Sequence, residues 1–158
     1  YDNIAKKIYT KEDIFFLGRG IDYSLCMEAS LKLKEISYIH SEAYAAGELK
    51  HGTISLIEQN TPVIGLVTDK NLAMKTISNI KETKARGSFV VLVTLDSIYE
   101  DYKNDDFYDE IITLKDLNDF TSPLLAMTIF QLLSYEVAYL KGEEIDKPRN
   151  LAKSVTVE

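Results

Sequence analysis

Hydrophobic residues in this chain gather in short continuous runs rather than at alternating positions. Four runs rich in Val, Ile, Leu and Phe cover residues 14–18, 62–68, 88–95 and 110–114. A continuous apolar run of this length is typical of a strand covered on both faces, because a strand with one solvated face alternates polar and apolar residues. The pattern therefore indicates parallel strands buried inside an α/β domain.

Helical patterns follow three of these runs, over residues 23–38, 71–86 and 123–140. In the first helix, four apolar residues recur at helical spacing and are expected to face the sheet: Leu25, Ala29, Leu33 and Ile36. Strands that alternate with helices predict a three-layer α/β domain with a parallel sheet. In such a domain, ligands bind at the carboxyl ends of the strands.

The third helical segment is nearly apolar and raises the question of a membrane span. It contains Gln131 and Glu136, and it falls short of the roughly 20 apolar residues that a bilayer requires. Ser122 is expected to cap its start, with Pro123 as its first helical residue and Gly142 just past its end. These signals favour a buried core helix and no membrane partner.

Two stretches are expected to lack regular structure. Residues 96–110 are acidic and are interpreted as a solvated connection between strands. Residues 143–158 have no helical period and contain Pro148, which is typical of a frayed chain end.

Composition limits the class of protein. The 158 residues are 46% hydrophobic and 27% charged, which fits one globular domain with its own core. The net charge of −7 argues against a nucleic-acid partner, since such proteins gather Lys and Arg. Cys26 is the only cysteine, so no internal disulfide forms and a cytoplasmic location is favoured over a secreted one. The chain opens on Tyr1 without a signal-peptide pattern, and we expect it to be a piece of a longer protein.

Both histidines and a Lys-x-x-Glu pair lie within KLKEISYIHSEAYAAGELKHG, residues 32–52. From spacing alone, Lys32 and Glu35 are interpreted as an exposed ion pair on the first helix. His40 is expected to make a structural hydrogen bond. Two histidines without patterned carboxylates match no zinc spacing, so no metal site is expected. His51, which is expected at the start of a further helix, is harder to place in a core and suits proton transfer to a sugar oxygen.

The loop GRGID, residues 18–22, follows a strand and opens a helix, which is where backbone N–H groups can hold a phosphate. It lacks the Ser or Thr hydroxyls that usually complete such a cradle. Asp22 would also repel a phosphate from the positive end of the helix. A tight turn with an acidic cap is therefore favoured over a phosphate site.

Four long motifs resemble one family. They read FFLGRG, CMEASLKLKEISYIHSEAYAAGELKHGTISLI, PLLAMTIFQLLSYEVAYLKG and DKPRNLAKSVTVE, and they extend over nearly the whole chain. They are similar to the isomerase half of the glucosamine–fructose-6-phosphate aminotransferase (isomerizing) family. The resemblance implies the second of two SIS (sugar isomerase) subdomains, a three-layer αβα fold with a five-stranded parallel sheet, over residues 1–142. Residues 143–158 would be a C-terminal tail that contributes to the active site.

The resemblance also implies an activity and its partners. The full-length enzymes convert fructose 6-phosphate and glutamine to glucosamine 6-phosphate and glutamate in amino-sugar biosynthesis, with no metal and no organic cofactor. The partners implied are the first SIS subdomain, the glutaminase domain and a second subunit in a homodimer. Because the Ser/Thr-rich phosphate loop belongs to the first SIS subdomain, residues 1–158 alone are expected to be inactive.

Five positions carry the family's site residues. By resemblance, Glu35 is the base that moves a proton between C1 and C2, and Lys32 assists proton transfer and stabilises developing charge. His51 would open the sugar ring from the neighbouring subunit. Lys153 would form a Schiff base with the sugar carbonyl, and Ala152 would offer a backbone carbonyl to a sugar hydroxyl.

Two other functions remain alternatives. One is a deglycase or phosphosugar isomerase built from the same SIS halves, which the tail NLAKSVTVE fits poorly. The other is a non-catalytic sugar-phosphate sensor, as in SIS-containing regulators, which would not require Glu35 and Lys153. A helix-turn-helix upstream of Tyr1 would indicate the sensor, and a glutaminase domain would indicate the aminotransferase.

Overall fold

The computed structural model describes residues 1–150. Five strands form one parallel sheet in the order β2-β1-β3-β4-β5. The strands are β1 (Asp13–Gly18), β2 (His40–Ala45), β3 (Pro62–Val67), β4 (Phe89–Leu95) and β5 (Glu110–Leu114). The helices are α1 (Asp2–Ile8), α2 (Ile21–Ser37), α3 (Ala73–Lys84), α4 (Asp96–Tyr102) and α5 (Thr121–Lys141), with short 3₁₀ turns η1 (Leu49–His51) and η2 (Thr53–Leu56).

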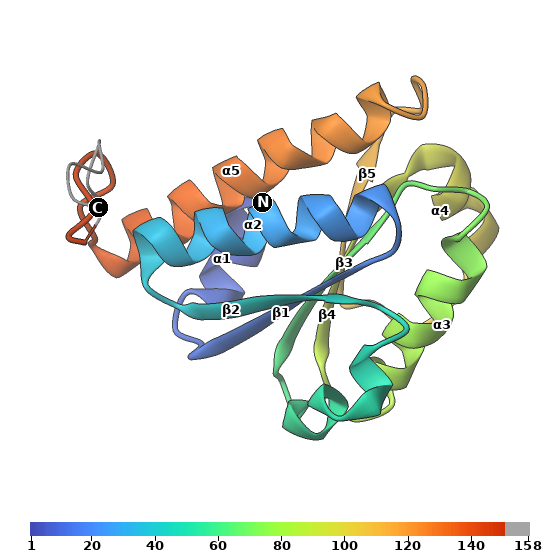
Figure 1. Ribbon diagram of the computed structural model, residues 1–158, viewed down its shortest axis with the longest axis horizontal. Coiled ribbons are helices and arrows are strands. Elements are labelled where there is room, and N and C mark those ends of the chain that lie inside the picture. The colour runs from blue at the N-terminus through green and yellow to red at the C-terminus, as the bar shows by residue number, and fades with distance from the viewer. Residues whose placement is uncertain (151–158) are drawn as a thin grey trace, which may run out of the picture.

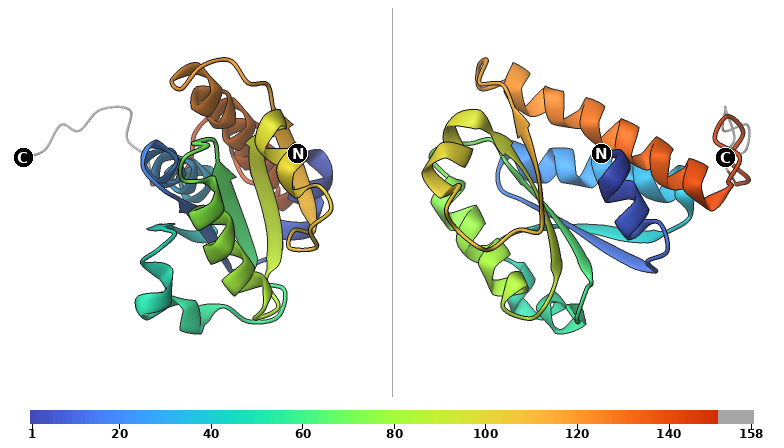
Figure 2. Two further views of the ribbon diagram at one scale, coloured as in Figure 1. Left: turned by 90° about the vertical axis from the view of Figure 1, so that its right-hand side faces the viewer. Right: turned by 180° about the vertical axis from the view of Figure 1, so that it is seen from behind.

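The helices form two layers, one on each face of the sheet. The helices α1, α2 and α5 pack together on one face, whereas α3 and α4 cover the other (Figures 1 and 2). The chain runs from β1 outward to β2 and then returns past β1 to β3, so the strand order reverses between β1 and β3. The expected three-layer α/β fold with a five-stranded parallel sheet is confirmed.

The core lies around β1, β3 and β4, the three strands with a neighbour on both sides. All six residues of β3 are buried, as are five of the six in β1. Phe16 in β1 meets Phe130 in α5 edge to face, with ring centroids 5.8 Å apart. This geometry is favourable for aromatic pairs and joins the sheet to its longest helix. The four apolar runs of the sequence are thus the four strands that were expected.

The remaining strand, β2, is not visible in the hydrophobic pattern. It is an edge strand with the sequence HSEAYA, and Ser41 is its one fully buried residue. An edge strand needs little apolar surface, and none of these residues is β-branched. The expectation that His51 lies at the start of a further helix is also wrong, because residues 49–51 form only the short 3₁₀ turn η1.

Two other expectations need correction. Residues 96–102 are the helix α4 rather than a solvated connection, and Ile98 anchors that helix in the core. Ser122 does not cap α5, because its hydroxyl accepts a hydrogen bond from Leu117 N. Asn118 Oδ1 instead accepts bonds from the N–H groups of Phe120 and Thr121. The expected end of the helix is confirmed, since Gly142 follows α5 in the left-handed conformation.

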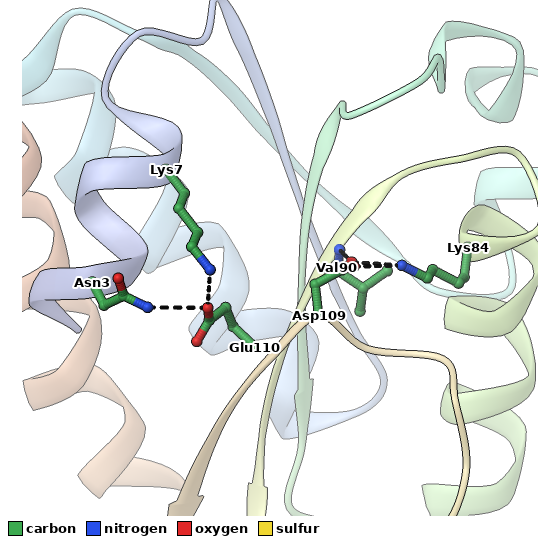
Figure 3. Close-up of polar contacts among 6 residues, drawn as sticks. All are labelled: Asn3, Lys7, Lys84, Val90, Asp109 and Glu110. Carbon is green, nitrogen blue, oxygen red and sulfur yellow. Dashed lines mark hydrogen bonds and ion pairs between the residues drawn. The ribbon is translucent and has the colours of Figure 1, made fainter.

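Adjacent residues at the start of β5 fasten helices on both faces of the sheet (Figure 3). Glu110 contacts Asn3 and Lys7 of α1. Asp109 points the opposite way, where it accepts bonds from Lys84 of α3 (2.7 Å) and from a backbone N–H of β4 (2.7 Å). The two carboxylates therefore link both helical layers to one edge of the sheet.

The helix α5 is buried on one face only. By length and composition it is apolar enough to cross a membrane, and 39% of its most apolar window is buried. Its inner face packs on α1 and α2, as a core helix does. Its outer face exposes several large side chains: Leu124, Leu132, Tyr135 and Tyr139. The expectation of a core helix is therefore correct for one face.

Candidate functional site

The last turns of α2 bring a lysine and a carboxylate into direct contact. Lys32 Nζ lies 2.8 Å from Glu35 Oε2 and 3.5 Å from Glu28 Oε1. The hydrogen bond to Glu35 is the main cause that raises the pKa of Lys32, so Lys32 is an ammonium ion at neutral pH. A carboxylate beside a fixed ammonium group can accept a proton from a substrate, while the cation stabilises the negative charge that is left on the substrate.

This pair alone does not identify a site. Both side chains are partly exposed, and an exposed ion pair contributes only about 0–1 kcal/mol to stability. What distinguishes Lys32 and Glu35 from a surface ion pair is the segment of chain that is held beside them.

That segment follows α5 and docks on the end of α2. Tyr38 caps α2 in the left-handed conformation, with φ of 59°. Its hydroxyl accepts a 2.8 Å hydrogen bond from Arg149 N, and the Arg149 guanidinium lies 3.9 Å from its ring centroid. In Figure 1 the segment after α5 accordingly reaches the end of α2. The contact holds residue 149 against Tyr38, which follows Glu35 by three residues in the sequence.

The predicted site residues Ala152 and Lys153 lie outside the residues that the structure describes.

His51 lies at the other end of the sheet. The strand β2 starts with His40 beside Asp13 and ends with Ala45 beside Gly18. The helix α2 ends where β2 begins, whereas His51 follows the end of β2. Six residues of strand separate these ends by about 20 Å. The structure therefore does not bring His51 and Glu35 together within one chain, and His51 is exposed on its turn.

His40 has the structural role that the sequence suggested. Its Nδ1 lies 2.5 Å from Asp13 Oδ1, and the two residues are paired at the first positions of β2 and β1. This contact fastens the edge strand to its neighbour and is remote from the carboxyl end of the sheet.

The carboxyl edge of the sheet contains a buried carboxylate in the loop GRGID. Asp22 is 3% exposed and accepts hydrogen bonds from Thr68 N (2.7 Å), Thr68 Oγ1 (2.5 Å) and Asp69 N (3.4 Å). Burial raises its pKa, and the bonds from Thr68 oppose that shift. The expected acidic cap is wrong, because Asp22 binds the end of β3 and not its own helix. Its carboxylate occupies the backbone N–H groups of Thr68 and Asp69 at the end of β3.

A cavity of about 550 Å³ lies beyond the ends of β3, β4 and β5. Its wall includes Lys70, whose Nζ lies 2.7 Å from Asp116 Oδ1. The contacts with Lys70 and Ser97 lower the pKa of Asp116 to about 2, so the pair is ionised and its charges cancel. Asp69 and Asp119 add negative charge to the wall. The cavity therefore offers an anion no net attraction.

Residues 1–150 contain no group of three or more His, Cys, Asp or Glu side chains placed to bind a metal. Sequence reasoning did not find Tyr38, because an aromatic residue just after a helix has no distinctive pattern. It also missed the contacts of Arg19, which join segments far apart in the sequence.

Comparisons with known proteins agree on one family. Residues 7–141 match the family model described as SIS domain. The chain is 54% identical over 156 residues to the glutamine–fructose-6-phosphate aminotransferase [isomerizing] of Clostridium tetani, and the match covers 98% of this chain and 25% of that protein. The chain thus spans about a quarter of the length of this relative.

Solved structures give the same grouping. The C-terminal domain of glucosamine-fructose-6-phosphate aminotransferase from Francisella tularensis superposes with a TM-score of 0.84 at 40% identity, covering 92% of this chain and 40% of that one. A glucosamine-6-phosphate deaminase from Thermotoga maritima superposes with a TM-score of 0.69 at 25% identity, covering 98% and 45%.

Proposed function

The chain belongs to the SIS domain family, and we propose that it is the second SIS subdomain of a glutamine–fructose-6-phosphate aminotransferase (isomerizing). Residues 1–142 would form the subdomain and residues 143–158 its active-site tail. The contact between Lys32 and Glu35, beside the point where Tyr38 holds the tail, is the observation that carries this proposal. It gives the acid–base pair a neighbour that an ordinary surface ion pair lacks.

In the proposed reaction, fructose 6-phosphate and glutamine become glucosamine 6-phosphate and glutamate. Glu35 takes a proton from C1 of the sugar imine and returns it to C2. The ammonium group of Lys32 stabilises negative charge that develops on the way. The Schiff base is assigned to Lys153 by the match of the tail to the family motif, and the hydrogen bond from Lys32 to Glu35 raises the pKa of Lys32, which favours its unreactive ammonium form. The backbone carbonyl of Ala152 accepts a hydrogen bond from a sugar hydroxyl.

The position of His51 supports an active site shared between two subunits. It is exposed, and the whole length of β2 lies between its turn and the end of α2 that carries Glu35, so it is out of reach of the base in its own chain. We assign it to ring opening in the site of the neighbouring subunit of a homodimer, where an imidazole can transfer a proton to the ring oxygen.

The exposed face of α5 supports a second association within the same polypeptide. The chain spans about a quarter of its aminotransferase relative, so most of such a protein lies outside it. Leu132, Tyr135 and Tyr139 are large apolar or amphipathic side chains of the kind that pack in domain interfaces. We assign this face to the first SIS subdomain, with the glutaminase domain beyond it. The single, buried Cys26 fits the proposed cytoplasmic location.

The alternative functions receive less support. Identity to the deaminase is 25%, against 54% to the aminotransferase, and both relatives share the fold. A sensor has no need of the Lys32–Glu35 pair. The aminotransferase is therefore the function that the geometry and the comparisons support best.

A mixing experiment tests the proposal in the full-length enzyme. Glu35→Gln keeps the shape of the side chain and removes the base, so it should abolish glucosamine 6-phosphate formation and leave glutamine hydrolysis intact. His51→Ala subunits alone should keep only a small residual activity. Mixed dimers of the two variants should regain activity, because one of their two sites contains both groups. Solvent exchange of the C1 proton in Glu35→Gln, or no recovery in verified mixed dimers, would contradict the assignments.

A further inference from the structure

The loop after β1 places a guanidinium against the backbone of a distant turn. Arg19 lies in the GRGID loop, and Gly47 lies four residues before His51. A Cβ atom added to Gly47 would be 2.5 Å from Arg19 Nη2, 3.1 Å from Cζ and 3.2 Å from Nη1. The guanidinium is therefore packed against position 47, and it occupies the space that a side chain there would need.

This contact explains why residue 47 is glycine. Gly47 is not among the glycines with positive φ, which are Gly20, Gly52, Gly87 and Gly142. Its backbone would accept other residues, so the guanidinium is what excludes a side chain at this position.

A third element fixes the guanidinium in place. Arg19 Nη2 donates a 2.8 Å hydrogen bond to Oδ1 of Asn79, which is 7% exposed in the middle of α3. Asparagine is a poor helix former, and burying its amide is costly unless a partner satisfies it. Asn79 Nδ2 points to Glu82 at 3.4 Å, which leaves Oδ1 for the arginine. Arg19 Nε is buried without a hydrogen-bond partner among residues 1–150. The position of Arg19 therefore leaves one of its own donors unsatisfied.

The turn that Arg19 contacts at Gly47 is the same turn that carries His51. Ala46 N donates to Gly18 O at 2.9 Å, and the Leu49 side chain is buried in the core. Together with the guanidinium at Gly47, these contacts fix the turn on its inner side, whereas His51 is left exposed on its outer side. The position of the imidazole therefore follows from where Arg19 holds the backbone.

We propose that Arg19 is a positioning residue for the neighbouring subunit's reaction: its guanidinium, held by Asn79, packs against Gly47 and keeps the turn in place, so that His51 projects from its subunit in one fixed orientation. This inference rests on the proposed role of His51. Arg19 acts only through the turn and touches no substrate.

Four variants of the full-length enzyme test it. Arg19→Ala removes the guanidinium, and Gly47→Ala displaces it by placing a methyl group 2.5 Å from Nη2. Each should lower kcat for glucosamine 6-phosphate formation by about 10- to 100-fold, because misplacing a catalytic group by about 1 Å has effects of this size. Glutamine hydrolysis should be unchanged. In the double variant Arg19→Ala/Gly47→Ala, the added methyl group should lower kcat no further than Arg19→Ala does alone. Arg86→Ala is the matched control, since Arg86 is exposed and, among residues 1–150, its guanidinium donates only to Glu82 O.

Combination with His51→Ala separates positioning from general damage. If Arg19 acts through His51, Arg19→Ala should change the kcat of the His51→Ala enzyme by less than about twofold, since coupled residues are not additive. In mixed dimers, Arg19→Ala subunits should recover activity with Glu35→Gln subunits and not with His51→Ala subunits. A full further loss in the His51→Ala background, or recovery with His51→Ala subunits, would overturn the inference and leave the proposed function intact. A fully active His51→Ala enzyme would contradict both.

Discussion

The guanidinium of Arg149 lies 3.9 Å from the ring centroid of Tyr38, although 111 positions separate the two residues in the sequence. The backbone N–H of Arg149 also donates to the Tyr38 hydroxyl at 2.8 Å. A cation over an aromatic face and a hydrogen bond to the same side chain fix both the position and the direction of the chain at this point. Tyr38, three residues after Glu35, thus holds the tail at the end of α2.

Weakening this contact should impair sugar binding in the full-length enzyme. Tyr38→Phe removes the hydroxyl acceptor and Arg149→Ala removes the cation. Each interaction contributes roughly 1 kcal/mol, so each variant should raise KM for fructose 6-phosphate by about fivefold. Lys147→Ala, at an exposed cation of the same segment, is the control and should have no effect. Unchanged KM in both variants, or an equal loss of glutamine hydrolysis, would show that the contact does not serve the tail.

Borohydride trapping should place the sugar on Lys153 and not on Lys32. The tail motif assigns the Schiff base to Lys153, and the hydrogen bond to Glu35 raises the pKa of Lys32, which makes Lys32 the less reactive amine. The full-length enzyme treated with fructose 6-phosphate and borohydride should give one modified peptide, identified by mass spectrometry, and Lys153→Arg should abolish it. An adduct on Lys32 would reverse the two assignments.

The hydrophobic pattern predicted the central strands of the sheet but not the edge strand β2 or the surface helix α4. Three of the strands predicted from apolar runs, β1, β3 and β4, are buried because both of their faces are covered. The fourth, β5, is an edge strand in which only Leu114 is fully buried, so its apolar run does not indicate a strand covered on both faces. The strand β2 could not be found in this way, since an edge strand such as HSEAYA is half exposed and is held by backbone pairing with β1. The helix α4 was missed for a similar reason: it is acidic, and Ile98 is its one fully buried residue.

The contacts of the candidate site also fall into two groups, those that sequence spacing predicts and those that only the fold creates. Lys32 and Glu35 were recognisable because they are three residues apart on one helix, where spacing predicts contact. The contacts of Tyr38 with Arg149 and of Arg19 with Gly47 join segments brought together only by the fold. No local pattern encodes such pairs.

Asp22 should be a structural residue whose loss destabilises the chain. Asp22→Ala leaves the donors of Thr68 and Asp69 without their acceptor, which costs about 1–3 kcal/mol per buried group. Asp22→Asn keeps one acceptor oxygen and should cost less. Urea unfolding measures both, with Asp119→Ala at an exposed acidic residue of the same edge as the control. If Asp22→Ala unfolds at the same urea concentration as Asp119→Ala, the hydrogen bonds from Thr68 and Asp69 to Asp22 do not stabilise the fold.

The contribution of Asp22 should also depend on pH. Burial raises its pKa in the folded chain, so the folded state holds the proton more tightly than the unfolded state does. The stability of the wild-type chain relative to Asp22→Asn should therefore be greatest below the unfolded pKa of about 3.9 and decline as the pH rises through the raised value. Urea unfolding at two pH values checks the sign. A difference that grows toward neutral pH would contradict it.

Residues 1–158 alone should fold and fail to bind fructose 6-phosphate. The sheet, its two helical layers and the core around Phe16 lie within residues 1–150, so folding requires no other segment of chain. Binding of a sugar phosphate depends mainly on its phosphate, and the carboxyl edge of this sheet is unsuited to one. The Asp22 carboxylate holds the N–H groups of Thr68 and Asp69, and Lys70 is neutralised by Asp116. A net charge of −7 adds no long-range attraction for an anion.

An NMR titration of residues 1–158 with fructose 6-phosphate decides the point, with inorganic phosphate as a second titrant. Neither should shift the amide resonances of residues 18–22 or 68–71 in a saturable way below millimolar concentrations. Asp22→Ala frees the two backbone N–H groups, so this variant, if folded, should gain weak phosphate binding at residues 68–69. Micromolar binding to the unaltered chain, with shifts at these loops, would show that the carboxyl edge is a phosphate site despite its buried carboxylate. The active site would then not depend on the first SIS subdomain for its anion contacts.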